Sequence, residues 1–221
     1  MIEEFAKLIP TSLQDLSGAV FYSGRNAFKG KKELYILGFN PGGSDINKRN
    51  TIKSHTDQVL SITNQNWSEY KDVSWGDNRP PGSHGLQPRI LHLLEKTNLS
   101  PYEVPSSNVC FVRSKLIKDL SLEQRNLYLE LCWTFHEKVI KELGIKVILC
   151  FGKNAGNFVR NKLAAFNPRG ESIEINKRKW KSLAYCNEKG QFVIVATHPS
   201  RADWTNPDSD PSDLVNNMLQ K

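Results

Sequence analysis

Short, unbroken apolar runs alternate along this sequence with longer segments of helical periodicity. The runs occupy residues 34–38, 108–112, 146–151 and 192–197. Runs of this length, without alternating polar residues, are typical of parallel strands that helices cover on both faces. The sequence therefore predicts an α/β protein: a three-layer α/β/α sandwich around a central, mainly parallel, about four-stranded sheet.

Helix-start and helix-stop signals flank several of the intervening segments. Ser121 and Gln124 have capping-box form, and Gly144 stands where the long helix that follows should end. Further helices are expected near residues 2–9, from residue 87, over 155–163 and up to residue 219. The polar stretch 44–85 has no clear periodicity, and long irregular segments in compact domains are often functional.

Size and composition bound the organisation of the chain. With 221 residues, of which 38% are hydrophobic, residues 1–221 are expected to form a single domain with one sizeable core. No apolar run approaches the roughly 20 residues of a membrane span. The acidic start Met1–Phe5 lacks a signal-peptide pattern. We expect a monomeric, cytoplasmic protein without a membrane partner.

The four cysteines give no metal-binding pattern. They are widely spaced, with no C-x-x-C pair, which argues against a structural zinc and against a four-cysteine iron–sulfur cluster. Three of them stand among apolar residues, where buried free thiols are expected: Cys110, Cys132 and Cys150. We expect neither a metal nor an organic cofactor.

The chain is basic, and the excess of positive charge is clustered. There are 30 Lys and Arg against 23 Asp and Glu, a net charge of +7. The clusters are at 29–32, 48–49 and 177–181. Because phosphate contacts release counterions and supply affinity, three clusters in one small domain favour a nucleic acid as partner. For any one cluster taken alone, a solvated face is the better interpretation.

Two polar turns follow apolar runs and should meet. Parallel strands end at the same edge of a sheet, so residues 38–45 and 197–204 are expected to face one crevice. Asn108 stands at the head of the run 108–112. It lies either where that strand enters the sheet or, if strand pairing begins earlier, in the crevice.

Several of these residues together resemble a known family. Gly38-Phe39-Asn40-Pro41-Gly42 matches the first motif of the uracil-DNA glycosylase superfamily, and His198-Pro199-Ser200 matches the second. Ser107-Asn108-Val109 and Gly152-Lys153-Asn154-Ala155 resemble the family's intervening strand and helix start. The form of the motifs is similar to the mismatch-specific and the single-strand-selective monofunctional branches. The resemblance covers about residues 33–205.

The resemblance implies roles for individual residues. Asn40 would hold the attacking water, His198 would donate a hydrogen bond to the base oxygen on which negative charge grows, and Asn108 would read the base edge. For His198 and Asn108 a purely structural role is the alternative. Trp75, Trp67 or Tyr70 would stack on the flipped base, and Trp75 is our candidate.

Other residues would complete the binding surface. The turn Gly38, Phe39, Pro41, Gly42 and Gly43 would surround the base, because its loose backbone allows amide groups to approach a base or a phosphate. Lys153 and Ser200 would contact DNA. Arg201 or Trp204 would be inserted into the helix to hold the base out; the alternative is an ordinary surface loop whose arginine extends its charged end to solvent.

The resemblance predicts a monofunctional DNA glycosylase that hydrolytically removes uracil, or a related or modified pyrimidine, and leaves an abasic site in DNA. Which base is removed stays open, since the segment 44–85 that should line the pocket matches no named branch. One alternative is an inactive relative that binds DNA or protein. Another is a doubly wound nucleotide-binding domain, although no phosphate-binding glycine motif is present.

Overall fold

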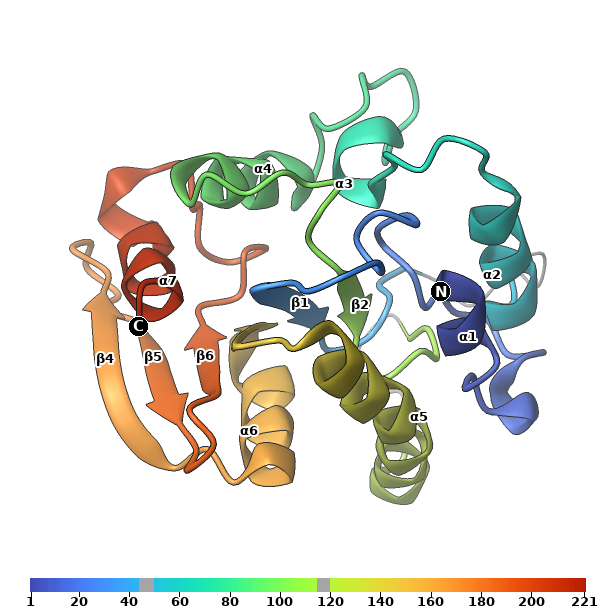
Figure 1. The fold of residues 1–221 in the computed structure, drawn as a ribbon. Coiled ribbons are helices and arrows are strands. Elements are labelled where there is room, and N and C mark those ends of the chain that lie inside the picture. The colour runs from blue at the N-terminus through green and yellow to red at the C-terminus, as the bar shows by residue number, and fades with distance from the viewer. Residues whose placement is uncertain (44–49, 115–119) are drawn as a thin grey trace.

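The protein is described by a computed structural model that covers residues 1–43, 50–114 and 120–221. Ser44, Asp45 and the basic pair Lys48–Arg49 lie outside the described residues. In the described part of the chain, six strands form one sheet in the order β2-β1-β3-β6-β5-β4 (Figure 1). Four of them are parallel: β1 (Leu34–Gly38), β2 (Ser106–Asn108), β3 (Val147–Phe151) and β6 (Phe192–Ala196).

Two antiparallel strands extend the sheet beyond β6. β5 (Lys181–Cys186) runs antiparallel to β6, and β4 (Asn167–Ile173) runs antiparallel to β5 and forms the edge. The sequence predicted about four strands and missed this hairpin. β4 is NPRGESI, exposed along most of its length, so it carries no apolar run that would reveal a strand.

Helices cover both faces of the sheet and confirm the predicted three layers. One face packs against α1 (Ile2–Ala6), α5 (Leu122–Leu143) and α6 (Gly152–Leu163). The other packs against α4 (Gln87–Lys96) and α7 (Ser212–Leu219). Successive side chains of β1 alternate between the two layers, so that Tyr35 and Leu37 face the first and Leu34 and Ile36 the second. Short elements complete the chain: η1 (Thr11–Leu13), α2 (Ile52–Ser61), α3 (Glu69–Asp72) and η3 (Pro207–Ser209).

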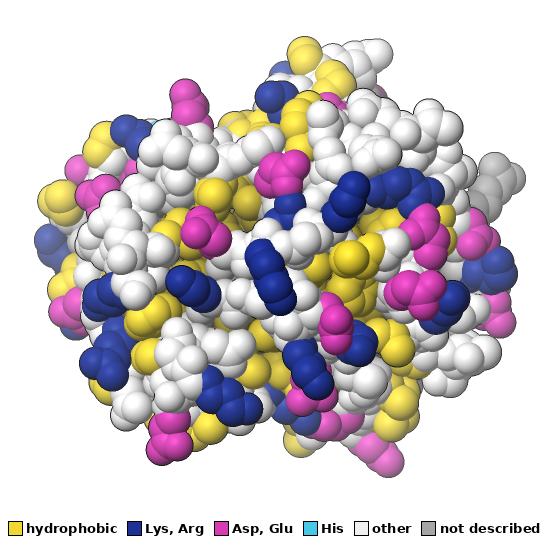
Figure 2. Space-filling model, viewed as in Figure 1, with side chains coloured by type: hydrophobic (Ala, Val, Ile, Leu, Met, Phe, Trp, Pro, Cys, Tyr) yellow, Lys and Arg dark blue, Asp and Glu magenta, His cyan; other side chains and the backbone are white. Residues whose placement is uncertain are grey.

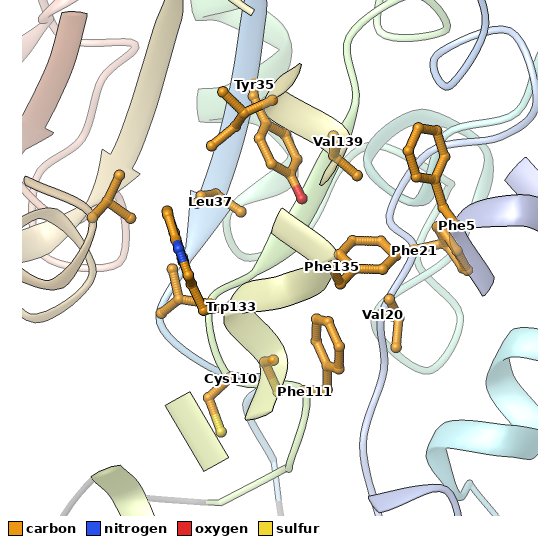
Figure 3. Packing of buried hydrophobic residues seen from close by; sticks show 14 of the residues in the cluster. Phe5, Val20, Phe21, Tyr35, Leu37, Cys110, Phe111, Trp133, Phe135 and Val139 are labelled. Carbon is orange, nitrogen blue, oxygen red and sulfur yellow. The ribbon is translucent and has the colours of Figure 1, made fainter. Parts of the chain in front are cut away.

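An aromatic cluster ties the N-terminal segment to the first layer (Figure 3). Phe135 of α5 meets Phe5, Phe21 and Phe111 edge-on, with ring centroids 5.2 to 6.2 Å apart. Each such ring contributes roughly 1.5–3 kcal/mol through burial. The cluster therefore anchors the segment before β1 and the segment after β2, which flank the two strands.

The long helix forms as its end signals predict. The Ser121 hydroxyl accepts a hydrogen bond from the backbone of Gln124, and the Gln124 side chain accepts one from the backbone of Ser121. Gly144 ends the helix with φ 65°, a left-handed conformation that glycine adopts without a steric cost. α5 consequently stops where β3 can begin three residues later.

The polar segment is more structured than its composition suggests. The described residues 50–85 contain α2 and α3, and Thr51 and Ser68 accept the capping hydrogen bonds at their N-termini. The sequence analysis predicted neither helix. α2 has only three buried positions, which form too weak an apolar pattern: Ile52, Thr56 and Val59. α3 is only four residues long.

All four cysteines are free and buried, as expected for three of them. No helix among the described residues is long and apolar enough to cross a membrane. The described residues also contain no group of three or more His, Cys, Asp or Glu side chains that could hold a metal ion.

Candidate functional site

The candidate site lies at the carboxyl edge of the four parallel strands. Leu37 of β1 pairs with Cys150 of β3, and Phe151, the next residue of β3, pairs with Ala196 of β6. The turns after β1 and β6 therefore leave the sheet at the same level. Neighbouring strands lie about 4.8 Å apart, so with β3 between them the ends of β1 and β6 are separated by roughly 10 Å.

Asn40 follows β1, half-buried, with its amide group held in one orientation. Its Nδ2 donates to Oγ of Ser114 at 2.9 Å, to the Ser114 carbonyl at 3.2 Å and to the Pro41 carbonyl at 3.1 Å. Both donor hydrogens are therefore committed to this loop. Within the described part of the chain Oδ1 has no hydrogen-bond donor, so this oxygen is the atom of the amide that can accept a hydrogen bond from a ligand or a water molecule.

Asn108 is the last residue of β2, so it lies buried at the carboxyl edge of the sheet rather than at the strand's entry. It pairs with Gly38 in the parallel ladder, because β2 begins at Ser106, two residues before the apolar run that the sequence pointed to. A Cβ on Gly38 would lie 2.1 Å from Oδ1 of Asn108. The glycine of the first motif therefore leaves room for the Asn108 amide against the end of β1.

A buried polar cluster adjoins Asn108. Burial, reinforced by the charge of Glu69, raises the pKa of Tyr22 to about 12, while Arg113 and the side chain of Asn108 act in the opposite direction. Burial also raises the pKa of Glu69. Burial, with help from the charge of Arg113, lowers the pKa of His55 to about 4. The cluster thus places buried ionisable groups with shifted pKa values beside Asn108.

Three aromatic residues were candidates for stacking on a base, and the structure separates them. Tyr70 is buried and Trp67 packs against the first core layer. Trp75 is half-buried, donates from Nε1 to Oε1 of Glu69 at 2.8 Å and meets Tyr70 edge-on at 5.7 Å. Of the three, Trp75 combines partial exposure with a link to the polar cluster.

His198 follows β6 with a defined proton position. Its Nδ1 accepts from the backbone N–H of Ser200 at 3.1 Å and lies 2.7 Å from Oγ of Ser200. Burial, and the positive charge of Arg201, lower the pKa of His198 below its ordinary value. The imidazole is therefore neutral at neutral pH with its proton on Nε2, which makes Nε2 a hydrogen-bond donor.

The turn after β3 supports the His198 ring. Gly152 has φ +82°, and a Cβ there would contact the Cβ and Cδ2 of His198 at 3.5 Å. Phe151 meets the imidazole edge-on at 6.2 Å. Lys153, the next residue, is exposed at the first turn of α6, where a cation can face the crevice edge.

The loop after His198 corrects one prediction. Trp204 is fully buried, donates from Nε1 to the Thr197 carbonyl at 3.2 Å and packs edge-on against Phe151 at 5.5 Å. It belongs to the core beneath the loop and is not placed to enter a DNA helix. Ser200 and Arg201 are exposed and keep their position beside His198.

The turn after Asn40 is shaped by its glycines. Gly43 has φ +95°, which L side chains rarely adopt, and the Gly42 carbonyl accepts a hydrogen bond from Arg113. Phe39 and Pro41 are buried, and their backbone carbonyls accept hydrogen bonds from the backbone of Cys110 at 2.9 Å and of Ser114 at 3.4 Å. Arg113 thereby links the glycine turn to the polar cluster around Tyr22 and Glu69.

Sequence reasoning missed five residues of this site. Arg113 and Ser114 follow the apolar run 108–112, so the rule that placed residues 38–45 at the crevice would have found them. The others come from segments that are distant in sequence, and no local pattern marks them: Tyr22, His55 and Glu69.

Two open hollows of about 620 and 580 Å³ lie along β4, and neither is lined by Asn40, Asn108 or His198. Searches of protein-family models and of curated proteins find no match to this chain. The geometry at the carboxyl edge of the sheet is therefore the basis for a functional proposal.

Proposed function

We propose that the protein is a monofunctional DNA glycosylase that hydrolyses the bond between deoxyribose and a uracil or related pyrimidine base. The observation that carries the proposal is that an oriented hydrogen-bond acceptor and an oriented hydrogen-bond donor lie at the same edge of the sheet. Asn40 offers Oδ1 to a water, and His198 offers Nε2–H to a base oxygen.

The reaction follows from these two groups. The target base leaves the helix stack and enters the crevice between the turns after β1 and β6. As the glycosidic bond breaks, the electron pair moves to the base, and the Nε2–H of His198 stabilises the negative charge on its carbonyl oxygen. The water on Asn40 adds to C1′ of the sugar and loses a proton to solvent, and the base anion takes up a proton from solvent. The products are a free base and an abasic site.

Asn108 supplies base selection in this proposal. An asparagine amide presents one donor edge and one acceptor, which matches the adjacent N–H and carbonyl groups of uracil or thymine. The buried polar groups of the adjoining cluster would meet the substituents of the base. The proposed substrate is thus a pyrimidine with a 4-carbonyl group, and substituents at its C5 position are what the cluster would discriminate.

A panel of oligonucleotides tests the proposal. Duplex and single-stranded oligonucleotides containing uracil, a thymine mispair or a 5-substituted uracil are incubated with the protein and then treated with alkali. Strand cleavage that depends on both Asn40 and His198 is expected for at least one of them. If every substrate survives while the protein binds DNA, the protein is a binding module and the proposal fails.

A further inference from the structure

A basic hairpin tip lies beside the candidate site and is not used by the proposed reaction. It comprises residues 174–181, between β4 and β5, and holds four basic side chains and one acidic one. Figure 1 shows the tip beside α7 and the segment that leads into this helix. Figure 2 shows Lys and Arg side chains spread over the same face of the molecule.

The sheet topology places this tip at the crevice edge. β5 runs antiparallel to β6, with Leu183 paired to Val195, so the start of β5 lies beside the end of β6. The Ser182 hydroxyl accepts a hydrogen bond from the Thr197 backbone at 3.0 Å, one residue before His198. Ile175 donates to the carbonyl of Asp208 at 2.9 Å. The tip is thus attached on both sides to the segment that carries His198.

The tip is ordered by its own contacts. The Asn176 side chain accepts from the backbone of Arg178 at 2.9 Å, and Lys179 takes a left-handed conformation with φ 52°. The backbone of Glu174 donates to the Trp180 carbonyl at 2.8 Å. These hydrogen bonds close a tight turn, so its lysines are presented from a fixed backbone.

Arg178 neutralises the only acid of the tip and connects it to the site. Its guanidinium pairs with the buried Glu174 at 3.0 Å, lies over the Trp180 ring at 4.3 Å, and donates to the backbone carbonyl of Arg201. The Glu174 charge is therefore offset. Lys181 pairs with Glu171 at 3.0 Å, so the remaining exposed charge of the tip is that of Lys177 and Lys179.

We propose that the hairpin tip 174–181 binds the phosphate backbone of the DNA strand that flanks the nucleotide held at the Asn40–His198 crevice. The inference rests on the proposed function, because that function makes DNA the ligand of the adjacent crevice. Lys177 and Lys179 supply two phosphate contacts. The exposed part of Trp180, 39% of its surface, supplies an apolar contact for the neighbouring sugar.

A second basic cluster provides the matched control. Lys29 and Lys31 are also exposed and spaced two residues apart, but they precede β1. Lys31 reaches the carbonyl of Glu142 near the C-terminal end of α5. They therefore lie toward the amino edge of the parallel strands, opposite to the crevice, and should not touch DNA bound there.

The test measures binding of the full-length protein to a duplex containing a tetrahydrofuran abasic analogue, by fluorescence anisotropy over a range of salt concentrations. The double variant Lys177→Gln/Lys179→Gln should weaken binding about tenfold at low salt. The slope of log K against log salt should also fall by about 2, since each phosphate contact contributes about 0.9. Lys29→Gln/Lys31→Gln should leave both quantities unchanged.

Equal effects of the two double variants, or an unchanged slope in the hairpin variant, would overturn the assignment. If excision by the unmodified protein is measurable while the hairpin variant binds normally, the hairpin inference alone fails. If the unmodified protein neither binds DNA nor releases a base, both proposals fail. Thermal unfolding of each variant checks that the exposed substitutions leave the fold intact.

Discussion

The side-chain amide of Asn40 donates a hydrogen bond to Oγ of Ser114 at 2.9 Å, across a gap of 74 residues in the sequence. This bond decides which end of the amide faces the crevice. With Nδ2 turned toward Ser114, Oδ1 is the group presented to a water molecule. Ser114 is therefore a positioning residue for the proposed reaction, although it does not touch the substrate.

Ser114→Ala should lower the rate of base release about threefold to tenfold, whereas Asn40→Ala should remove nearly all of it. The smaller effect is expected because one hydrogen bond contributes about 1 kcal/mol, and the carbonyls of Ser114 and Pro41 still accept from Nδ2. Single-turnover excision kinetics measure both variants. Ser114→Thr restores the hydroxyl and should recover activity; an inactive Ser114→Thr with normal thermal stability would argue against positioning through the hydroxyl.

Gly38→Ala should disable base reading while the sheet remains folded. A Cβ at this position would lie 2.1 Å from Oδ1 of Asn108, which forces the buried Asn108 side chain to move. We expect excision to fall about tenfold or more, a loss of at least 1.4 kcal/mol in transition-state stabilisation. The same substitution in an Asn108→Ala background should have little further effect. Additive losses in that double-variant cycle would show that Gly38 acts through something other than Asn108.

The sequence predicted the parts of this site that depend on local pattern. The apolar run 34–38 placed Asn40 at a strand end, and the run 192–197 did the same for His198. The sequence did not decide whether Asn108 lies at the entry or at the end of its strand. The start of β2 is set by pairing with β1, which local sequence does not encode. The partners of Asn108, such as Tyr22 and Glu69, depend on the whole fold.

Trp204 is a residue for which the sequence prediction was wrong. Its place after the second motif suggested an exposed side chain, but the indole is buried in the core. Trp204→Ala should lower the free energy of unfolding by about 3–5 kcal/mol, since a fully buried indole is lost. Arg201→Ala should change stability by less than about 0.5 kcal/mol, because its side chain is exposed. Urea unfolding compares the two variants. A Trp204→Ala protein with unchanged stability would contradict the core position of the indole.

The protonation state of His198 makes a prediction about pH. Burial and the charge of Arg201 hold the pKa of His198 below its ordinary value of 6.5. Protonation at Nδ1 would set a donor against the Ser200 N–H that now donates to it, so only the neutral ring keeps this geometry. The excision rate should therefore stay level as pH falls to about 6.5 and decline only below it.

Arg201→Gln tests the cause of this behaviour. Removing the positive charge takes away one of the two effects that lower the pKa of His198, so the acid limb of the pH–rate profile should move to higher pH. His198→Ala should reduce the rate on the order of 10²–10³-fold and remove the dependence on this group. Profiles of kcat/KM against pH for the three proteins measure the effect. A rate that rises as pH falls below about 6.5 would instead make the imidazolium the active form of His198.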